Sequence, residues 1–374
     1  AIERNTVGSL ALAPAFSEDK ALLHESKFRV GQRLEIMDYL NGSQLHPARI
    51  QNICGRRMHV QIKARDSIPG KDTMKNKRQT GSDGEFWVDQ ESIFIFPVGF
   101  AFYNNLELIA NDGYKKHAEK IADAIRNGTP PEYHVNDVTF EDLARVTPDT
   151  FDQVKVGHKF ELLDPLNQQF LEFEIATVLR LCETPGYMIV CVDGSNAKLE
   201  SFPIHINNTF MFPAGYAREN GLKVRMPKVK GFKGNARWEH YLAHKKAEAL
   251  PTVALRPEME DGRREKLKVG MFLEAADQSD NQYIYPAMIR SIHGRVVKLG
   301  FLGWGKEADQ LYDIDSHDLL PAGWCEMHGY QLRPLTTNQK YTLRELLNDG
   351  DVEDSDEDGD DSDDEEKEED EMGE

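Results

Sequence analysis

The segment from Gly300 to Asp313, GFLGWGKEADQLYD, carries Phe301 and Trp304 three residues apart in a glycine-rich stretch that follows an apolar run. No obvious pattern buries both rings at such a turn, so they are candidates for contact with a ligand. Aromatic faces attract an alkylated ammonium ion and cover its methyl groups, each face contributing about 0.5–2 kcal/mol. A nearby carboxylate could accept a remaining N–H, with a strength of about 1.5–3 kcal/mol. The surrounding elements decide whether the two rings pack in a core or face such a cation.

The body of the chain contains three copies of one unit. The segments FRVGQRLEIMDYLN, VKVGHKFELLDPLN and LKVGMFLEAADQSD, which begin at Phe28, Val154 and Leu267, share Val-Gly, an apolar residue before Glu, and an Asp seven residues after the Gly. A second landmark follows each of them, FPVGF, FPAGY and LPAGW, with prolines 116 and 108 residues apart. Two landmarks that recur three times in the same order indicate three structural repeats.

Each repeat reads mainly as strands, and the segments between repeats read as helices. The runs EIATVLRLC and GYMIVCVDG of the second repeat are rich in β-branched and apolar residues and are separated by turn residues. The segment before the second repeat has apolar residues at the spacing of one helix face, namely Ala118, Ile121, Ala122 and Ile125. Gly128 is expected to end this helix. We therefore expect each complete repeat to be a helical arm followed by a small barrel of about five strands. The first arm is expected to be short.

Two further helices are predicted from their boundary residues. Thr139, with Asp142 three residues later, has the pattern of a capping box, and Pro148 would stop the helix that follows. Before the third repeat, Asn235 is a candidate N-cap and Pro251 is the expected terminator. These helices would belong to the arms of the second and third repeats.

The acidity of the chain is concentrated in a tail. The formal net charge is −19, and residues 349–374 hold 18 acidic residues and one Lys, so the preceding 348 residues carry only −2. The tail has too few apolar residues to offset chain entropy by burial, and it is predicted to be disordered. It could contact basic partners such as histones, or only keep the protein soluble. The nearly neutral body argues against DNA binding as the main activity.

Several functional classes have no support in the sequence. No run of 18 apolar residues occurs, so no membrane span is predicted. The four cysteines form no CxxC pair, which argues against a zinc ribbon and a disulfide framework and fits a reducing compartment. His240 and His244 share a helix face but lack the partners of a metal site, so no metal and no cofactor are expected. The chain has no GxSxG, P-loop or similar motif, and we expect no enzymatic activity.

The motifs of the third repeat resemble a known family. The combination RWEHYL, LKVGMFLEAAD, GFLGW and LPAGWCEMHGYQLRP is similar to the malignant brain tumour (MBT) repeat, which belongs to the Tudor-like barrels, and the match is essentially gapless from Val269 to Pro334. The first two repeats match more loosely. The resemblance implies a mainly β fold with helical arms, in which three Tudor/SH3-like β-barrel cores pack into a propeller-like body. The expected division is a linker at 1–19, repeats at 20–110, 111–227 and 228–335, a short helix at 336–348 and the disordered tail at 349–374.

The resemblance also implies a methyllysine pocket in the third repeat. In the family, the pocket uses the Asp of the first landmark, a polar residue three positions later, and aromatics in the pattern Phe-x-x-Trp-x-x-x-Tyr. The corresponding residues here are Asp277, Asp280, Phe301 and Trp304, with Ala308 in the Tyr position. The third aromatic wall is therefore absent from the motif, at an expected cost of about 1 kcal/mol or more. Either another ring replaces it, with Tyr283, Tyr285 and Tyr312 as candidates, or the pocket is a relic whose Phe and Trp only pack.

The first two repeats keep polar residues of the pocket without its aromatics. The polar pairs are Asp38 with Asn41 and Asp164 with Asn167, and the aromatic positions of the second repeat are Val192, Ser195 and Leu199. In the first repeat, an insertion at 63–84 replaces the cage segment. These Asp and Asn side chains could be remnants of pockets, or they could hold the turn between strands by bonding to local backbone.

Two functions follow from the resemblance. The first is a nuclear, chromatin-associated protein that binds histone tails, reads mono- or dimethylated lysine through the third repeat and acts in transcriptional repression. The alternative is a nuclear scaffold with degenerate cages, which binds protein partners through its repeats and histones through the acidic tail. Both readings expect histones, and allow other chromatin proteins, as partners. Neither expects a membrane or direct DNA binding.

Overall fold

The structure is a computed structural model that describes residues 9–10, 26–38, 41–62, 84–166, 171–227, 237–257 and 263–333. The chain divides into two compact units, 1–339 and 340–374, and all elements named below belong to the first. The predicted helix at 336–348 and the acidic tail lie outside the described residues, as does most of the predicted linker at 1–19. No helix in the described ranges combines the length and apolar character needed to cross a membrane.

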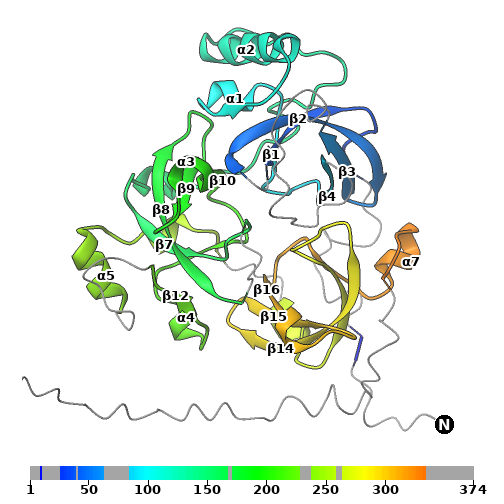
Figure 1. Ribbon diagram of the computed structural model, residues 1–374, viewed down its shortest axis with the longest axis vertical. Helices are drawn as coiled ribbons and strands as arrows, with labels where there is room; N and C mark the ends of the chain where they lie inside the picture. Colours follow the sequence, from blue (N-terminus) through cyan, green and yellow to red (C-terminus); the bar gives the residue numbers. More distant parts are fainter. Residues whose placement is uncertain are drawn as a thin grey trace, which may run out of the picture. The chain divides into compact units, whose positions relative to one another are not determined.

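Three sheets with one strand plan form the framework (Figure 1). In each sheet four consecutive strands pair as an antiparallel meander, and a short fifth strand pairs with the first. Repeat 1 contains β1 (Arg33–Asp38), β2 (Asn41–Cys54), β3 (Arg57–Ile62), β4 (Glu85–Asp89), β5 (Ile95–Phe96) and β6 (Glu107–Leu108). Repeat 2 contains β7 (Lys159–Leu162), β8 (Phe173–Leu181), β9 (Tyr187–Val192), β10 (Phe202–His205), β11 (Met211–Phe212) and β12 (Val224–Arg225). Repeat 3 contains β13 (Phe272–Ala276), β14 (Ile284–His293), β15 (Val296–Phe301), β16 (Gln310–Asp313) and β17 (Leu319–Leu320).

The long second strand of each sheet carries an irregularity at an equivalent place. The pairing register shifts between Ile50 and Asn52 in β2, between Val178 and Arg180 in β8, and between Ile289 and Ser291 in β14. An extra residue of this kind bends a strand and increases its twist. The bend lets one strand pair with both of its neighbours around a small, strongly curved sheet. The predicted mainly β fold with small barrel-like cores is confirmed.

The two sequence landmarks of each repeat bond directly to each other. The buried carboxylates of Glu35, Glu161 and Glu274 each accept two backbone N–H groups from the second landmark, over 2.7–2.8 Å. The glycines that donate, Gly99, Gly215 and Gly323, have φ of 93°, 94° and 91°, a left-handed conformation that favours glycine. Burial raises the pKa of Glu35 to about 7, although the bonds from Ala101 and Gly99 oppose this shift. We call this contact the glutamate clamp.

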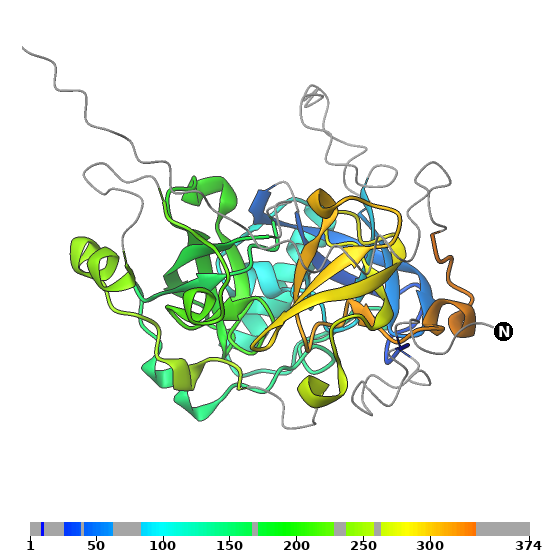
Figure 2. The same cartoon turned by 90° about the horizontal axis from the view of Figure 1, so that it is seen from below.

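Short helices connect the strands. They are α1 (Phe100–Tyr103), α2 (Asp112–Arg126), α3 (Ala197–Glu200), α4 (Tyr216–Glu219), α5 (Trp238–Lys245), α6 (Arg263–Lys266) and α7 (Trp324–His328), with 3-10 turns η5 (Asp149–Gln153), η6 (Thr252–Ala254) and η7 (Lys306–Ala308). The first predicted arm helix is α2, whose N-cap Asn111 accepts from the N–H of Tyr114 and whose buried residues include Ala118, Ile121 and Ala122. Helices α5 and α7 lie on opposite sides of the described body (Figures 1 and 2).

One predicted helix is absent, and the predicted end of another is wrong. Thr139 and Asp142 form the reciprocal capping bonds, at 2.8 and 3.2 Å, but only a turn follows them. Few residues remain before Pro148, which disfavours helical geometry in its predecessor, so no helix can propagate. The predicted terminator Pro251 does not end the helix before repeat 3, because α5 already ends at Lys245, and its C-cap Lys246 has φ of 53°. The predicted N-cap Asn235 lies outside the described residues.

Each repeat contacts both of the others. Repeats 1 and 2 share one hydrophobic core. Repeat 3 joins repeat 2 through the hydroxyl of Tyr216, which donates to His293 O over 2.8 Å, and joins repeat 1 through the buried Arg57, 3.5 Å from Asp318. A cavity of about 810 Å³, lined by residues of all three repeats, lies where they meet. Several of its charged side chains form ion pairs, as in the contacts of Arg56 with Asp89 and of Arg256 with Asp315.

Candidate functional site

The predicted aromatic pair stands at the end of β15. Phe301 closes the strand and is 4% exposed, whereas Trp304 in the following turn is 41% exposed. The N–H of Trp304 donates to Phe301 O over 3.1 Å, and Gly303 within this turn has φ of 85°, which favours glycine. The turn therefore brings the indole back to the same cavity that Phe301 lines, and this geometry accounts for the glycine at position 303.

A third aromatic ring completes the cage from the neighbouring strand. Tyr285 on β14 has its ring centroid 5.5 Å from that of Phe301 and 5.9 Å from that of Trp304. Of the other two candidates, Tyr312 is buried, with its hydroxyl 2.9 Å from Ala276 O. Tyr283 stacks under the guanidinium of Arg333, whose central carbon is 3.9 Å from the ring centroid. Tyr285 is therefore the ring that takes the place of the missing family Tyr.

The carboxylate of Asp277 is held at the base of the same site. Its Oδ1 accepts from Gln310 Nε2 over 2.7 Å and from the N–H of Ser279 over 2.8 Å. Gln310 is itself fixed, because its Oε1 lies 2.6 Å from the hydroxyl of Tyr312. Within the described residues, the second oxygen of Asp277 takes part in no hydrogen bond. One face of this half-buried carboxylate thus remains available to a ligand.

These residues surround a cavity of about 130 Å³. Its wall also includes Ser279, Glu307, Ala308 and Asp309. Ala308 lies in η7, so the family Tyr position does face the cavity but offers only a methyl group. Asp309 is buried, and burial raises its pKa, although Arg290 and Lys298 beside it oppose the shift. Glu307 and Gln310 were not singled out from the sequence, because neither belongs to the family pattern.

Asp280 lies apart from the cavity wall. Its Oδ1 accepts from the N–H of Gln282 over 3.3 Å, and its Oδ2 accepts from Gln282 Nε2 over 3.0 Å. Burial is the main cause that raises the pKa of its carboxyl group. The structure therefore gives Asp280 local contacts in the β13–β14 turn, whereas Asp277 faces the cavity.

The polar pairs of repeats 1 and 2 lie in local turns and at the contact between these repeats. Asp164 Oδ1 accepts from the N–H of Leu166 over 2.9 Å, and Asp38 lies 3.2 Å from His46 Nε2. Asn41 Oδ1 accepts from Ser43 Oγ over 2.7 Å, and Ser43 Oγ lies 2.9 Å from the backbone oxygen of Lys198 in α3. Asn167 and most of the insertion at 63–84 lie outside the described residues.

The close approach of Gly42 shows how tightly this turn packs on repeat 2. A Cβ at this position would lie 2.7 Å from Leu166 Cδ1 and 3.0 Å from Phe202 Cβ. Leu199, in the family Tyr position of repeat 2, belongs to the same α3 that receives Ser43. The surface that corresponds to the cage of repeat 3 is thus used in repeat 2 for contact with repeat 1.

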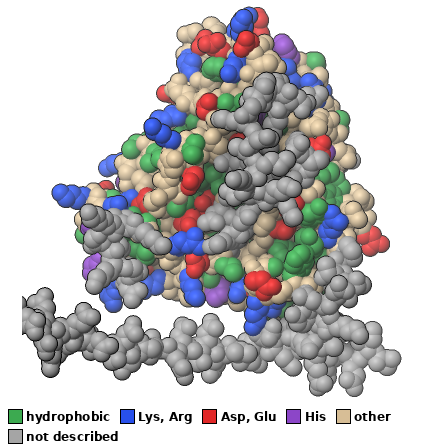
Figure 3. Space-filling view, in the orientation of Figure 1, with side chains coloured by type: hydrophobic (Ala, Val, Ile, Leu, Met, Phe, Trp, Pro, Cys, Tyr) green, Lys and Arg blue, Asp and Glu red, His purple; other side chains and the backbone are tan. Residues whose placement is uncertain are grey.

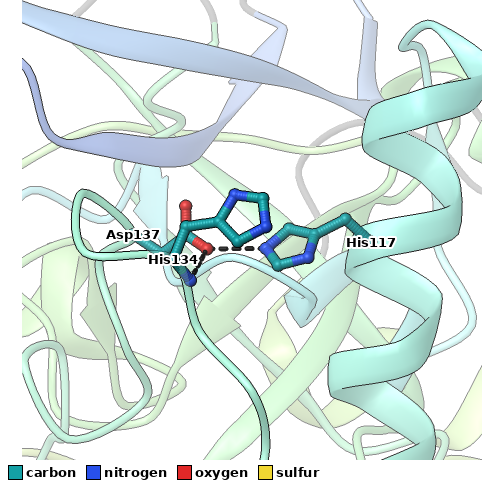
Figure 4. A group of neighbouring side chains, drawn as sticks. All are labelled: His117, His134 and Asp137. Atoms are coloured by element: carbon teal, nitrogen blue, oxygen red, sulfur yellow. Dashed lines mark hydrogen bonds and ion pairs between the residues drawn. The ribbon is translucent and has the colours of Figure 1, made fainter.

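A second polar cluster, which no sequence spacing indicated, lies between α2 and repeat 1 (Figure 4). His117, His134 and Asp137 bring potential metal-ligand atoms within 4.8 Å of one another. The buried Asp137 carboxylate accepts from Arg33 Nε over 2.8 Å and from Arg33 Nη2, from His117 Nε2 over 2.6 Å, and from the N–H of His134 over 2.9 Å. Burial acts to raise the pKa of Asp137, but the combined effect of these bonds is larger and opposite, so the pKa is lowered overall.

Hydrogen bonding accounts for this cluster without a bound ion. Arg33 Nη2 lies 2.9 Å from His134 Nδ1, and because arginine can only donate, the imidazole nitrogen must be the acceptor. The proton of a neutral His134 is then on Nε2, so neither ring nitrogen has a free lone pair for an ion. We therefore interpret the cluster as a polar joint that holds the arm of repeat 2 against β1.

Comparison with known proteins places this geometry in a family. The family model of the MBT repeat matches residues 32–115, 158–231 and 271–339. The chain is 49% identical over 338 residues to protein lin-61 of Caenorhabditis elegans, an alignment that covers 89% of this chain and 55% of that protein. It is 42% identical over 327 residues to malignant brain tumor repeat protein 1 of C. elegans, covering 85% and 57%. The chain thus spans little more than half the length of these two relatives.

More distant relatives include a solved structure. The chain is 29% identical over 322 residues to the Polycomb protein Sfmbt of Drosophila melanogaster, covering 82% of this chain and 24% of that protein. A crystal structure of the four MBT repeats of D. melanogaster Sfmbt in complex with the peptide RHR(me)KVLR matches with a TM-score of 0.66 and 28% identity, covering 82% of this chain and 67% of that one. Each of the three matched regions contains one of the three sheets, and together they cover more than half of the sequence. The chain belongs to the MBT repeat family.

Proposed function

We propose that this chain is a chromatin-associated protein that binds histone tails and reads lysine in its lower methylation states through repeat 3. The observation that carries the proposal is the cavity of about 130 Å³ between the rings of Tyr285, Phe301 and Trp304, with Asp277 at its base. Three aromatic faces and one carboxylate are the groups that a methylated ammonium ion requires.

The geometry favours ligands that keep an N–H. Each aromatic face contributes about 0.5–2 kcal/mol to binding of the cation, whatever its methyl count. Asp277 adds a charge-assisted hydrogen bond of about 1.5–3 kcal/mol only if the ligand has a proton to donate. A trimethylated lysine has none and is larger. We therefore expect mono- and dimethylated lysine to bind more tightly than the trimethylated form.

The relatives support this proposal. The Sfmbt repeats were crystallised with a peptide that contains a methylated lysine, and Sfmbt is named a Polycomb protein. We extend the proposal to a nuclear location and a role in transcriptional repression, which rest on this family relationship. On the face drawn in Figure 3, acidic and basic side chains are interspersed, which supports the expectation that DNA is not a main partner.

We propose a binding role and no catalysis. The thiols, the strongest potential nucleophiles of the chain, are poorly suited to attack, because burial raises the pKa of Cys182 to about 12 and that of Cys191 to about 11. A thiol that stays protonated near neutral pH is a weak nucleophile.

A scaffold function is the alternative. It is favoured by the contact between repeats 1 and 2, where the turn that carries Asn41 packs on α3 of repeat 2. In this reading the repeats bind protein partners, and the acidic tail binds histones by charge. Binding through the tail should weaken steeply with salt, whereas binding in the cage should depend on methylation state.

Calorimetric titration separates the two functions. The peptide RHRKVLR, carrying no, one, two or three methyl groups on its lysine, is titrated into the wild type and into Trp304→Ala. Leu199→Ala is the matched control, because Leu199 is exposed by 49% and holds the family Tyr position in repeat 2. The reader proposal expects methyl-dependent binding that Trp304→Ala weakens by about fivefold or more and Leu199→Ala leaves unchanged. If peptide affinity depends neither on methylation nor on the Trp304 substitution, the result would favour the scaffold function.

A further inference from the structure

The cage of repeat 3 contains more negative charge than one aspartate provides. Three acidic side chains contribute to its wall: Asp277, Glu307 and Asp309. Asp309 is 3% exposed and is already paired, with Oδ1 3.0 Å from Arg290 Nε and Oδ2 3.4 Å from Lys298 Nζ. The cationic side chains of Arg290 and Lys298 therefore compensate the negative charge of this carboxylate. Asp277 and Glu307 remain as the acidic groups that can face a ligand.

Glu307 is free to act on a ligand. It is exposed on η7, and within the described residues no hydrogen bond or ion pair holds its carboxylate. The carboxylate folds back over Gly305, where a Cβ would lie 2.3 Å from one of its oxygens and 2.4 Å from the other. A glycine at 305 thus leaves space for this carboxylate at the start of η7.

The alanine at position 308 opens the same side of the cavity. The family places a Tyr here, whose ring would cover this wall, but Ala308 contributes only a methyl group. The aromatic wall has moved to Tyr285 on β14, on another element. The η7 side of the cavity is therefore acidic rather than aromatic, and the Asp277 carboxylate comes from a different segment, the β13–β14 turn.

Two carboxylates match the donors of one methylation state. A lysine ammonium has three N–H groups, and each methyl group removes one, so monomethyllysine keeps two and dimethyllysine keeps one. We infer that Glu307 is a second acceptor beside Asp277 and makes this pocket select monomethyllysine over dimethyllysine. This inference rests on the proposed reader function. Unmethylated lysine would lose affinity, because its third N–H would point at an aromatic wall and lose its water without a new acceptor.

The experiment compares methylation states in matched glutamate variants. RHRKVLR peptides with zero to three methyl groups are titrated into the wild type, Glu307→Gln and Glu326→Gln. Glu326 is an exposed glutamate on α7, away from the cavity wall, so its substitution changes the net charge equally without touching the site. Glu307 is exposed, and its substitution is not expected to affect folding.

The wild type should bind the monomethylated peptide at least about tenfold more tightly than the dimethylated one, as expected for one additional charge-assisted bond. Glu307→Gln should weaken monomethyl binding by a similar factor, change dimethyl binding by less than about twofold, and so remove the preference. Glu326→Gln should keep it. Equal mono- and dimethyl affinities in the wild type, or a preference that survives Glu307→Gln, would overturn the inference while leaving the reader function standing. If no peptide shows methyl-dependent binding, the reader function itself fails.

Discussion

Tyr285 meets Trp304 edge to face, with ring centroids 5.9 Å apart and ring planes at 82°. The two residues come from different segments, since Tyr285 belongs to β14 and Trp304 follows β15. The third wall of the cage is therefore held by the pairing of two strands, and the loss of the family Tyr at position 308 leaves three rings in place. Four predictions follow from this and related contacts.

Truncation of Tyr285 should weaken the cage. We expect Tyr285→Ala to reduce affinity for a monomethylated peptide about fivefold, because one aromatic face of about 1 kcal/mol is lost. Tyr285→Phe should keep most of the affinity, since the ring face remains. Tyr283→Ala is the control, because Tyr283 lies beside Tyr285 but outside the cavity wall. Equal binding by Tyr285→Ala and the wild type, measured by calorimetry, would remove Tyr285 from the site.

Gln310 should act by positioning Asp277. Its amide donates to Asp277 and its oxygen lies near the Tyr312 hydroxyl, so Gln310→Ala leaves both groups without this partner. We expect a loss of about 1–3 kcal/mol in the free energy of unfolding and about three- to tenfold weaker peptide binding. Gln310→Met fills a similar volume without the hydrogen bonds. Restored binding in Gln310→Met would show that packing alone explains the effect.

The glutamate clamp should be a stability element in every repeat. Glu161 accepts from Gly215 N, Ala217 N and Trp238 Nε1, the last over 2.6 Å. Glu161→Ala leaves these donors unpaired, and we expect a loss of about 2–4 kcal/mol in urea unfolding. Peptide binding in the surviving folded fraction should not change, because the cage is in repeat 3. Glu219→Ala, at an exposed site of α4, should stay within about 0.5 kcal/mol of the wild type.

An ion pair between repeats should make stability depend on acid pH. Glu91 Oε2 lies 3.0 Å from His317 Nε2, and this hydrogen bond is the main cause that lowers the pKa of Glu91 below its ordinary value of 4.5, against the effect of burial. Because the folded-state pKa lies below the unfolded one, the stabilisation is complete above pH 4.5 and is lost as the pH falls.

The Glu91 effect can be measured by urea unfolding at several pH values. Between about pH 5 and pH 3, the wild type should lose about 0.5–1 kcal/mol more stability than Glu91→Gln, a small value because the carboxylate is half exposed and screened by solvent. Glu326→Gln should follow the wild type. Parallel curves for the wild type and Glu91→Gln would contradict the prediction.

The sequence predicts the repeat plan well because its signature residues are in contact. The Val-Gly-Glu and Pro-x-Gly landmarks recur because the Glu carboxylate accepts the N–H of the left-handed glycine, as Glu274 does from Gly323. Both partners of this contact are thus visible in the sequence, because each belongs to a landmark that recurs in every repeat. The helix at α2 is predicted for a similar reason, since its apolar face and its end at Gly128 are local features.

The remaining features depend on non-local contacts. The motif could identify Phe301 and Trp304, but the choice of Tyr285 over Tyr283 and Tyr312 depends on strand register. Ala287 pairs with Phe301 across β14 and β15, so Tyr285, two residues along the same strand, lies on the same face. The helix predicted at Thr139 is absent although the capping bonds between Thr139 and Asp142 are formed, because the residues after them form only a turn. His117 lies on α2, whereas His134 and Asp137 share a turn after that helix, so no sequence spacing links the three residues.

The glutamate clamp has a consequence for how this architecture can change. It ties the first strand of each barrel to the end of the same barrel, whatever the length of chain in between. The link between the third and fourth strands is residues 63–84 in repeat 1, 193–201 in repeat 2 and 302–309 in repeat 3, and the three sheets still share one strand order. In repeat 3 this link carries Trp304, Glu307 and Ala308. It therefore forms an exchangeable loop, in which ligand preference can diverge, or be engineered by loop grafting, without a change in the contacts that close the barrel.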